Sequence, residues 1–197
     1  MNRIHTQTRR PPHPANRMIR FWHPKKIDRL FVILFSLLLI GSAQADSQRM
    51  SQHLSVFGAV QAEQQFTLGQ LKQLAGSHLK DIPVLCQSGA NKGHMESLSG
   101  VPLKTLLEHV GLKVPKGKDL RKVAILAYGT DDYWVTFSWG EIFNQPQGDR
   151  VLIYYAKNGQ ALGQESGQFA LMPTNDTRTG ARQVKWLERI EVRLMTP

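Results

Sequence analysis

The chain has 197 residues and a formal net charge of +10, with 25 lysines and arginines against 15 aspartates and glutamates. Such a balance suggests nucleic acid binding, but the charge is unevenly placed. The first 45 residues hold eight of the basic residues and one acidic residue, which leaves 17 basic and 14 acidic residues, a net of +3. Because the remainder is only mildly basic, no nucleic acid partner is expected. The single cysteine, Cys86, excludes an internal disulfide.

The first 45 residues have the pattern of a secretory signal peptide. A basic segment precedes an apolar run at residues 30–40, and small residues follow up to Ala43-Gln44-Ala45. We predict cleavage after Ala45 and export to a bacterial periplasm. An uncleaved anchor is the alternative, but the run is shorter than the roughly 20 residues of a spanning helix. Met18 is an alternative start, and the two prolines after Arg9-Arg10 argue against a twin-arginine signal.

Residues 46–197 have the length of one domain. The first half of this domain has two apolar runs of strand type and two short helical patterns. The predicted elements are a strand at 54–60, a helix capped by Thr67, a strand at 82–86, a polar loop at 87–99 and a helix at 102–110 ending at Gly111. Because of Pro83, the strand that contains it is expected either to lie at a sheet edge or to begin at this proline.

The second half is dominated by strands. They are predicted at residues 123–128, 133–138, 151–156, 169–172 and 184–194, with a helical turn at 139–143 and a hairpin turn at Asn158-Gly159. Because strands outnumber the short helices, the fold class is α+β, a single mixed, strand-rich domain.

A basic loop leads into the last predicted strand. Arg178, Arg182 and Lys185 surround Gly180, whose lack of a side chain allows a tight turn or a close approach to a ligand. Two guanidinium groups and an ammonium group suit a phosphate or a carboxylate. From the charges alone, a solvated basic loop beside a buried strand is the alternative interpretation.

Several short motifs resemble the molybdopterin-binding oxidoreductase domain of the sulfite oxidase family. They are, in chain order, a strand ending in Leu85-Cys86, the helix start Gly100-Val101-Pro102-Leu103, the segment Asp131-Asp132-Tyr133, the turn Asn158-Gly159 and the run G-A-R-Q-V-K-W-L from Gly180 to Leu187. The resemblance spans nearly all of residues 46–197 and implies the sulfite oxidase molybdopterin-domain fold. Asp132 stands where the family has glycine, and the turn before Gly180 is longer than in the family.

The resemblance assigns roles to individual residues. Cys86 would be the thiolate ligand of molybdenum, while Arg182 and Lys185 would hold the phosphate end of molybdopterin. Arg178 is a further candidate for this cofactor contact, although the longer turn gives it no counterpart in the family. His94, expected in the loop after Cys86, and Tyr133 are candidate catalytic residues for proton transfer or hydrogen bonding. Without the resemblance, Cys86 is more typical of a small buried hydrophobic residue at a strand end.

Two functions remain open. The first is an exported molybdopterin-dependent oxidoreductase domain acting on a small oxyanion or sulfoxide, with electrons passed to a membrane redox partner because the sequence has no C-x-x-C-H haem motif. The second is a periplasmic binding or sensing domain that has lost the cofactor and holds a small anionic ligand in the same pocket. Its motivation is the leader, because general secretion carries unfolded chains, which cannot bring a bound cofactor with them.

Overall fold

The computed structural model describes residues 50–196. The predicted signal peptide, its cleavage after Ala45 and the alternative start at Met18 all lie outside these residues. Between residues 50 and 196, no helix has the length and apolar character that crossing a bilayer requires.

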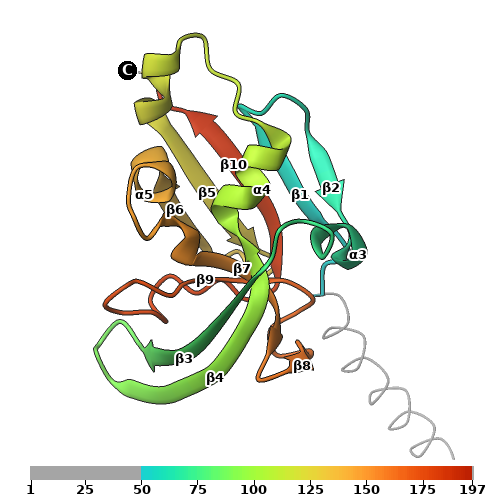
Figure 1. The fold of residues 1–197 in the computed structure, drawn as a ribbon, viewed down its shortest axis with the longest axis vertical. Coiled ribbons are helices and arrows are strands. Elements are labelled where there is room, and N and C mark those ends of the chain that lie inside the picture. Colours follow the sequence, from blue (N-terminus) through green and yellow to red (C-terminus); the bar gives the residue numbers. More distant parts are fainter. Residues whose placement is uncertain (1–49, 197) are drawn as a thin grey trace, which may run out of the picture. The chain divides into compact units, whose positions relative to one another are not determined.

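One sheet has five strands in the order β2-β1-β10-β5-β6 (Figure 1). Its strands are β1 (Leu54–Gly58), β2 (Gln64–Phe66), β5 (Val123–Gly129), β6 (Trp134–Ser138) and β10 (Leu187–Leu194). β1 and β10, from opposite ends of the described chain, pair in parallel, and the other neighbours pair antiparallel. The central position of β10 agrees with its apolar pattern.

The second sheet is antiparallel and has the order β3-β4-β7-β8, with β9 also pairing with β7. Its strands are β3 (Ser77–Leu85), β4 (Asn91–Pro102), β7 (Val151–Lys157), β8 (Gln160–Ala161) and β9 (Ala170–Pro173). β3 is at the edge of this sheet, as Pro83 predicted. Asn158 and Gly159 both have positive φ, which confirms the predicted hairpin turn between β7 and β8.

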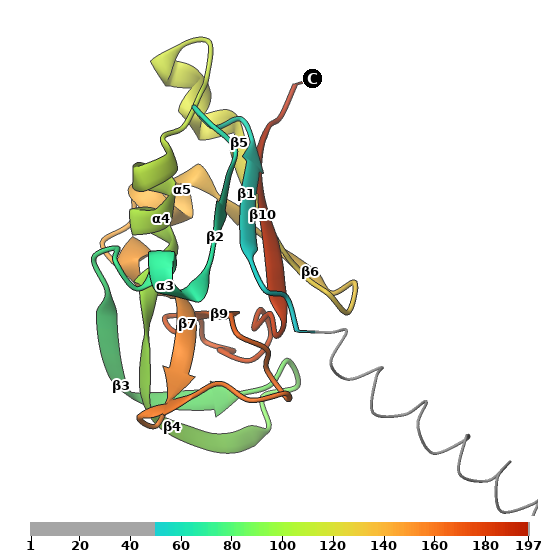
Figure 2. The same ribbon diagram turned by 90° about the vertical axis from the view of Figure 1, so that its right-hand side faces the viewer.

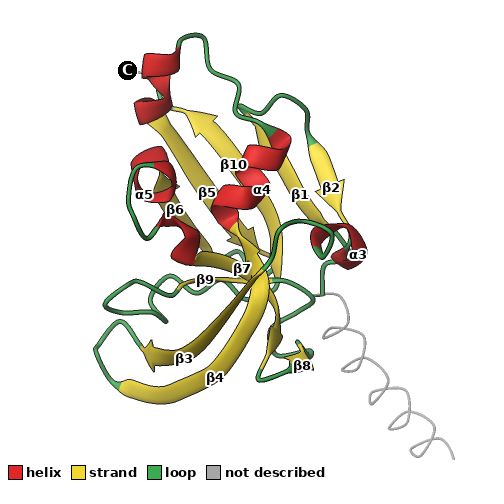
Figure 3. Ribbon diagram, viewed as in Figure 1, coloured by secondary structure: helices red, strands yellow, loops and turns green. Residues whose placement is uncertain are grey.

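The helices are short (Figure 3). They are α3 (Leu68–Leu71), α4 (Leu103–Val110), α5 (Trp139–Phe143) and the 3-10 turns η1 (Gly117–Lys122) and η2 (Gly148–Arg150). Thr67 caps α3, as predicted, and Ser138 caps α5, each in a reciprocal capping box. Gly111 ends α4 with positive φ, also as predicted.

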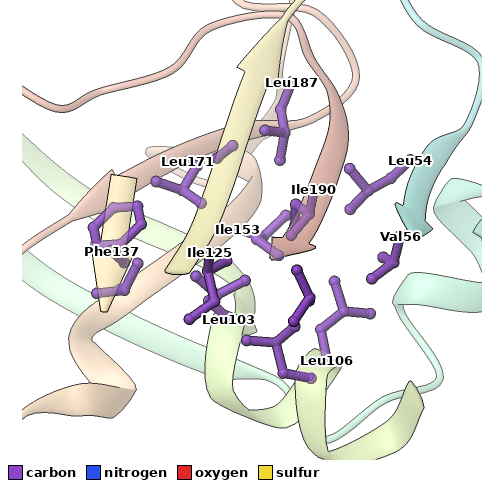
Figure 4. Packing of buried hydrophobic residues seen from close by; sticks show 14 of the residues in the cluster. Leu54, Val56, Leu103, Leu106, Ile125, Phe137, Ile153, Leu171, Leu187 and Ile190 are labelled. Carbon is purple, nitrogen blue, oxygen red and sulfur yellow. The ribbon is translucent and has the colours of Figure 1, made fainter. Parts of the chain in front are cut away.

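The main core lies between the five-stranded sheet and α4, which covers one side of that sheet together with α5 (Figure 2). Leu103 and Leu106 of α4 are fully buried and pack with Ile125 and Ile190 of the sheet (Figure 4). A smaller cluster of buried hydrophobic side chains belongs to the second sheet and includes Met95 of β4 and Tyr154 of β7. The strand-rich α+β class is therefore confirmed.

The prediction of a polar loop at residues 87–99 is wrong. Most of it belongs to β4, which pairs with β3 from Ser77 to Leu85, so the connecting turn is short. The prediction failed because this hairpin exposes most of its side chains and buries only Met95 and Leu98 between residues 87 and 99. A strand with so few buried positions has no clear alternation of apolar and polar residues. The last strand also begins later than predicted, at Leu187.

Candidate functional site

Cys86 comes directly after β3, at the start of a tight turn into β4. The turn is closed by the Gly89 N–H, which donates to the Cys86 carbonyl at 2.8 Å, and by the Cys86 N–H, which donates to the Ala90 carbonyl at 3.1 Å. Gly89 has a φ of 87°, a conformation that suits a residue without a side chain. The turn presents Cys86, which is partly exposed, at the end of the β3–β4 hairpin.

The surroundings of the Cys86 thiol favour the thiolate. Its pKa is lowered, first by the hydrogen bond with the Ser88 hydroxyl, whose Oγ lies 3.0 Å from Sγ. Backbone hydrogen bonds from Ser88 and Ala90 and the positive charge of Lys92 lower it further, and together they outweigh the opposing effect of burial. Thiolate is the form of cysteine that binds metals and attacks electrophiles.

The segment 178–180 lies against the strand end that carries Cys86. The Thr179 hydroxyl donates to the Pro83 carbonyl at 2.5 Å and accepts from the Leu85 N–H at 3.1 Å. The Gly180 N–H donates to the Leu85 carbonyl at 2.9 Å. Thr179 is only 2% exposed, so these hydrogen bonds replace contacts that water cannot make there. The basic loop and the Cys86 turn are therefore neighbours in space, although about ninety residues apart in sequence.

Arg178 brings a positive charge to the turn. A Cβ atom built on Gly89 would lie 1.8 Å from Nη1 of Arg178, so the guanidinium group occupies the space above that glycine. The Arg178 side chain is exposed, and within residues 50–196 no carboxylate forms an ion pair with it. A charged guanidinium group without a carboxylate partner suits an anionic ligand.

Tyr133 reaches the same segment from the other sheet. Its hydroxyl donates to the carbonyl of Ala181 at 2.7 Å, next to the residue that contacts Leu85. Burial, with the nearby charge of Asp131, raises the pKa of Tyr133, so the phenol keeps its proton at neutral pH. Asp132, which precedes Tyr133, has a φ of 65°. The end of β3 and Tyr133 of the β5–β6 connection thus contact the neighbouring residues Gly180 and Ala181, respectively.

Arg182 is held by two carboxylates. Its Nε and Nη2 donate to the two oxygens of Asp176 at 2.8 and 2.7 Å, and its Nη1 donates to Glu141 and to the Thr136 carbonyl, both at 3.1 Å. The guanidinium carbon also lies 4.5 Å from the centre of the Phe137 ring. The hydrogen bonds and negative charges of Asp176, which come first, and of Glu141 raise the pKa of Arg182 against the opposing effect of burial. The side chain joins β6, α5 and the loop after β9.

The other two predicted residues have different settings. The Lys185 ammonium group lies 5.7 Å from the centre of the Trp186 ring. His94 is exposed on β4 in register with Pro83, on the strand rather than in the predicted loop. The structure thus brings Cys86, Arg178 and Tyr133 to one segment. Among residues 50–196, neither Lys185 nor His94 forms a hydrogen bond with the Cys86 thiol.

Sequence reasoning missed Thr179 and Ser88, which contact the Cys86 strand end and thiol, and Asp176, which binds Arg182. Neither hydroxyl residue belongs to a recognisable sequence motif. Thr179 contacts a strand that is distant in sequence, and Ser88 lies in an irregular turn. The only signal was proximity in sequence to Arg178 and to Cys86.

The donor groups fit molybdopterin at one end and not at the other. A partly exposed thiol with a lowered pKa is a suitable ligand for a transition metal. Within residues 50–196, no three His, Cys, Asp or Glu side chains are grouped as a metal site, so Cys86 would act as a single protein ligand. Arg182 does not fit a phosphate as it stands, because Asp176 and Glu141 use most of its donors.

Comparison with known proteins agrees with this setting. The sequence model of a family described as the oxidoreductase molybdopterin binding domain matches residues 42–195. Among solved structures, the sulfane dehydrogenase SoxCD from Paracoccus pantotrophus is similar, with 20% identity and a TM-score of 0.56. The match covers 73% of this chain and 38% of that chain, so it spans well under half of the length of that chain. No curated protein matches the sequence.

Proposed function

The chain belongs to the oxidoreductase molybdopterin-binding domain family, which confirms the resemblance in its motifs, and on this basis we propose that it binds molybdopterin with Cys86 as the molybdenum ligand. The proposed activity is oxidation or reduction of a small oxyanion or sulfoxide. The proposed location is the periplasm, from the signal-peptide pattern of residues 1–45.

One observation carries the proposal, namely the setting of Cys86. Its thiolate is favoured by Ser88, by two backbone hydrogen bonds and by Lys92, and it stands at the end of a strand where a ligand can approach. Cys86 is also the single cysteine of the chain, and it is the residue that the motif resemblance assigns to the metal. A cysteine with a purely structural role gains nothing from thiolate stabilisation.

The protein's own groups would bind and orient, while bound molybdopterin would supply the two-electron redox chemistry. Cys86 would donate its thiolate to the metal. Arg178 and Lys185 are the basic residues of the loop without a carboxylate partner among residues 50–196, and either would neutralise phosphate or an anionic substrate. Tyr133, kept protonated by its raised pKa, holds the Ala181 carbonyl and thereby the loop.

Metal analysis of the exported protein tests this proposal. The full chain, expressed with its own leader in cells that make molybdopterin, is expected to contain near-stoichiometric molybdenum. Cys86→Ser is expected to lose the metal and to unfold at the same temperature as the metal-free wild type. Glu96→Ala, an exposed change on the neighbouring strand β4, is the control for purification and should keep the metal. Molybdenum retained in Cys86→Ser would overturn the assignment of the ligand.

A second function is favoured by one observation, the pairing of Arg182 with two carboxylates. If this pairing persists in solution, a cofactor phosphate gains no contact there, and the domain would instead hold a small anion beside Arg178 and report it to a membrane sensor partner. This alternative requires the metal-free protein to unfold at a higher temperature in the presence of a small anion. Sulfate, phosphate, thiosulfate and acetate at equal ionic strength are the probes, and chloride is the reference. Equal unfolding temperatures in all five would remove the alternative.

The activity also requires a partner for electrons. The sequence has no C-x-x-C-H haem attachment motif, so electrons would pass to a separate membrane redox protein. For a substrate that the protein oxidises, we expect one reduction of the molybdenum-loaded protein by the substrate. The purified protein alone should then stay reduced, because its electron acceptor is missing. Repeated turnover with no added electron acceptor would contradict the need for a partner.

A further inference from the structure

We propose that Thr179 is a positioning residue that fixes the Cys86 turn and sets Arg178 beside it. The inference rests on the proposed role of Cys86. It concerns Thr179, a residue for which neither the sequence motifs nor the comparisons give a role. The three consecutive residues 178–180 each contact the strand end or turn that carries Cys86, and each does so with a different group.

The first step concerns the backbone of the strand end. Pro83 has no N–H, and the pairing of β3 with β4 is irregular between Pro83 and Leu85. Backbone groups at such a place lack a regular partner and need another one. Thr179 supplies it, because a single hydroxyl accepts from the Leu85 N–H and donates to the Pro83 carbonyl. The Gly180 N–H then bonds the Leu85 carbonyl.

The second step concerns the buried hydroxyl itself. Thr179 is one of the few buried polar residues of the described chain, with 2% exposure. A hydroxyl buried to that degree costs free energy unless both of its hydrogen-bonding functions are used, and here both are. Valine has nearly the same shape but would leave the Leu85 N–H and the Pro83 carbonyl without their partner. The hydroxyl, and not the methyl group, therefore holds the two segments together.

The third step links this contact to charge at the site. Arg178 directly precedes Thr179, and its guanidinium group lies over Gly89, three residues after Cys86 in the turn. A long exposed arginine has many rotamers and would not stay at one place without a fixed backbone. Because Thr179 anchors that backbone to β3, the Arg178 Cα is held where its guanidinium group reaches the space over Gly89. Loss of the anchor would both loosen the turn and move the charge away.

Two measurements on the metal-free protein separate these effects. Hydrogen exchange of the segments 83–90 and 178–181 reports local opening, with β5 and β10 as internal references for global stability. Alkylation of Cys86, the only cysteine, by anionic iodoacetate relative to neutral iodoacetamide reports the positive charge beside the thiol. The full chain is prepared from cells unable to make molybdopterin, so failure to bind molybdenum and failure of the Thr179 contact give different results.

Thr179→Val is expected to speed exchange in the two segments while β5 and β10 keep their protection. The iodoacetate-to-iodoacetamide ratio should fall roughly two- to fivefold at low ionic strength, as expected for loss of one nearby charge. Thr179→Ser keeps the hydroxyl and should restore both readouts. Thr177→Val, an exposed change two residues away, is the matched control and should behave as the wild type.

Several results would overturn the proposal. One is faster exchange spread evenly over the whole domain in Thr179→Val, which would mean a general loss of stability. Another is a Thr179→Ser variant that behaves like Thr179→Val. Arg178→Gln keeps the test decisive if Thr179→Val does not fold, because its side chain is exposed. An unchanged alkylation ratio in Arg178→Gln would show that the guanidinium group does not act at the thiol.

Discussion

The guanidinium group of Arg178 occupies the space where a side chain of residue 89 would begin. Nη1 would lie 1.8 Å from a Cβ built on Gly89, and the guanidinium carbon would lie 2.7 Å from it. Gly89 is also in the left-handed region, with a φ of 87°. The residue is therefore constrained twice, once by backbone conformation and once by a charged neighbour from a distant part of the chain.

Gly89→Ala should displace Arg178 as well as strain the turn. The strain of an L-residue at positive φ costs about 1–2 kcal/mol, and the clash adds a local effect because the arginine side chain moves away. Gly93→Ala is a matched control in the same hairpin, since Gly93 has a φ of 96° and no atom within 4 Å of a built Cβ. Both variants should lose similar stability in urea unfolding. Only Gly89→Ala should lower the preference of Cys86 for iodoacetate, and an equal drop in both would contradict the contact.

Arg182 is expected to contribute mainly to stability. Arg182→Gln leaves Asp176 and Glu141 facing each other without the cation that bridges them. Loss of a hydrogen bond to a charged group costs about 1.5–3 kcal/mol, so the variant should be less stable than the wild type. Arg182→Lys keeps the charge but loses the forked geometry, so its stability should be intermediate. Urea unfolding midpoints measure both. Arg121→Gln, an exposed change, should stay within about 0.5 kcal/mol of the wild type.

The same variant separates two interpretations of Arg182. If its main role is to hold cofactor phosphate, Arg182→Gln would lose molybdenum but keep the unfolding midpoint of the metal-free protein. The ion pairs of Arg182 predict instead that metal-free Arg182→Gln unfolds at a lower urea midpoint than the metal-free wild type. A metal-free midpoint equal to that of the wild type would therefore favour the prediction made from the motif.

The sequence allowed the strand-rich fold and its caps to be predicted, because these depend on local patterns. Thr67 and Gly111 cap helices as their residue types suggest, and the Asn158-Gly159 turn needs positive φ at both residues. The first half of β4 could not be predicted, because its side chains from Asn91 to Glu96 are mostly exposed and lack the alternation that marks a strand. Its place is fixed by pairing with β3 and β7, which is a property of the folded chain.

The site divides in the same way. Cys86 and Arg178 could be selected as candidates because a thiol and a guanidinium group have chemistry that is visible in the sequence. Their proximity could not be predicted, since Thr179 and Gly180 contact β3 through a hydroxyl and a backbone N–H. The pairing of Arg182 was also hidden, because Glu141 lies in a separate helix and Asp176 in an irregular loop.

The ion pair of Glu141 gives stability that depends on pH. Burial opposes ionisation of Glu141, but hydrogen bonds from the Ser138 N–H and from Arg182 outweigh it and hold the pKa below its ordinary value. A carboxyl group whose pKa is lower in the folded state stabilises the fold above its unfolded pKa of about 4.3, and this contribution is lost as the pH falls through the folded pKa. The difference in unfolding free energy between wild type and Glu141→Gln should be constant near neutral pH and shrink below about pH 4. Urea unfolding at several pH values measures it, and a difference independent of pH would contradict the ion pair.

The reactivity of Cys86 should show the lowered pKa of its thiol directly. Because the thiolate is the reactive form, the rate of alkylation by iodoacetamide should rise with pH to a midpoint below the ordinary pKa of a cysteine thiol. Ser88 provides the largest lowering effect, so Ser88→Ala should move the midpoint to higher pH and slow alkylation at pH 7. Gln87→Ala, an exposed change beside Cys86, is the control and should leave the midpoint in place. The same midpoint in Ser88→Ala and the wild type would mean that the hydroxyl does not bond the thiolate, and the backbone hydrogen bonds and Lys92 would then have to account for the shift.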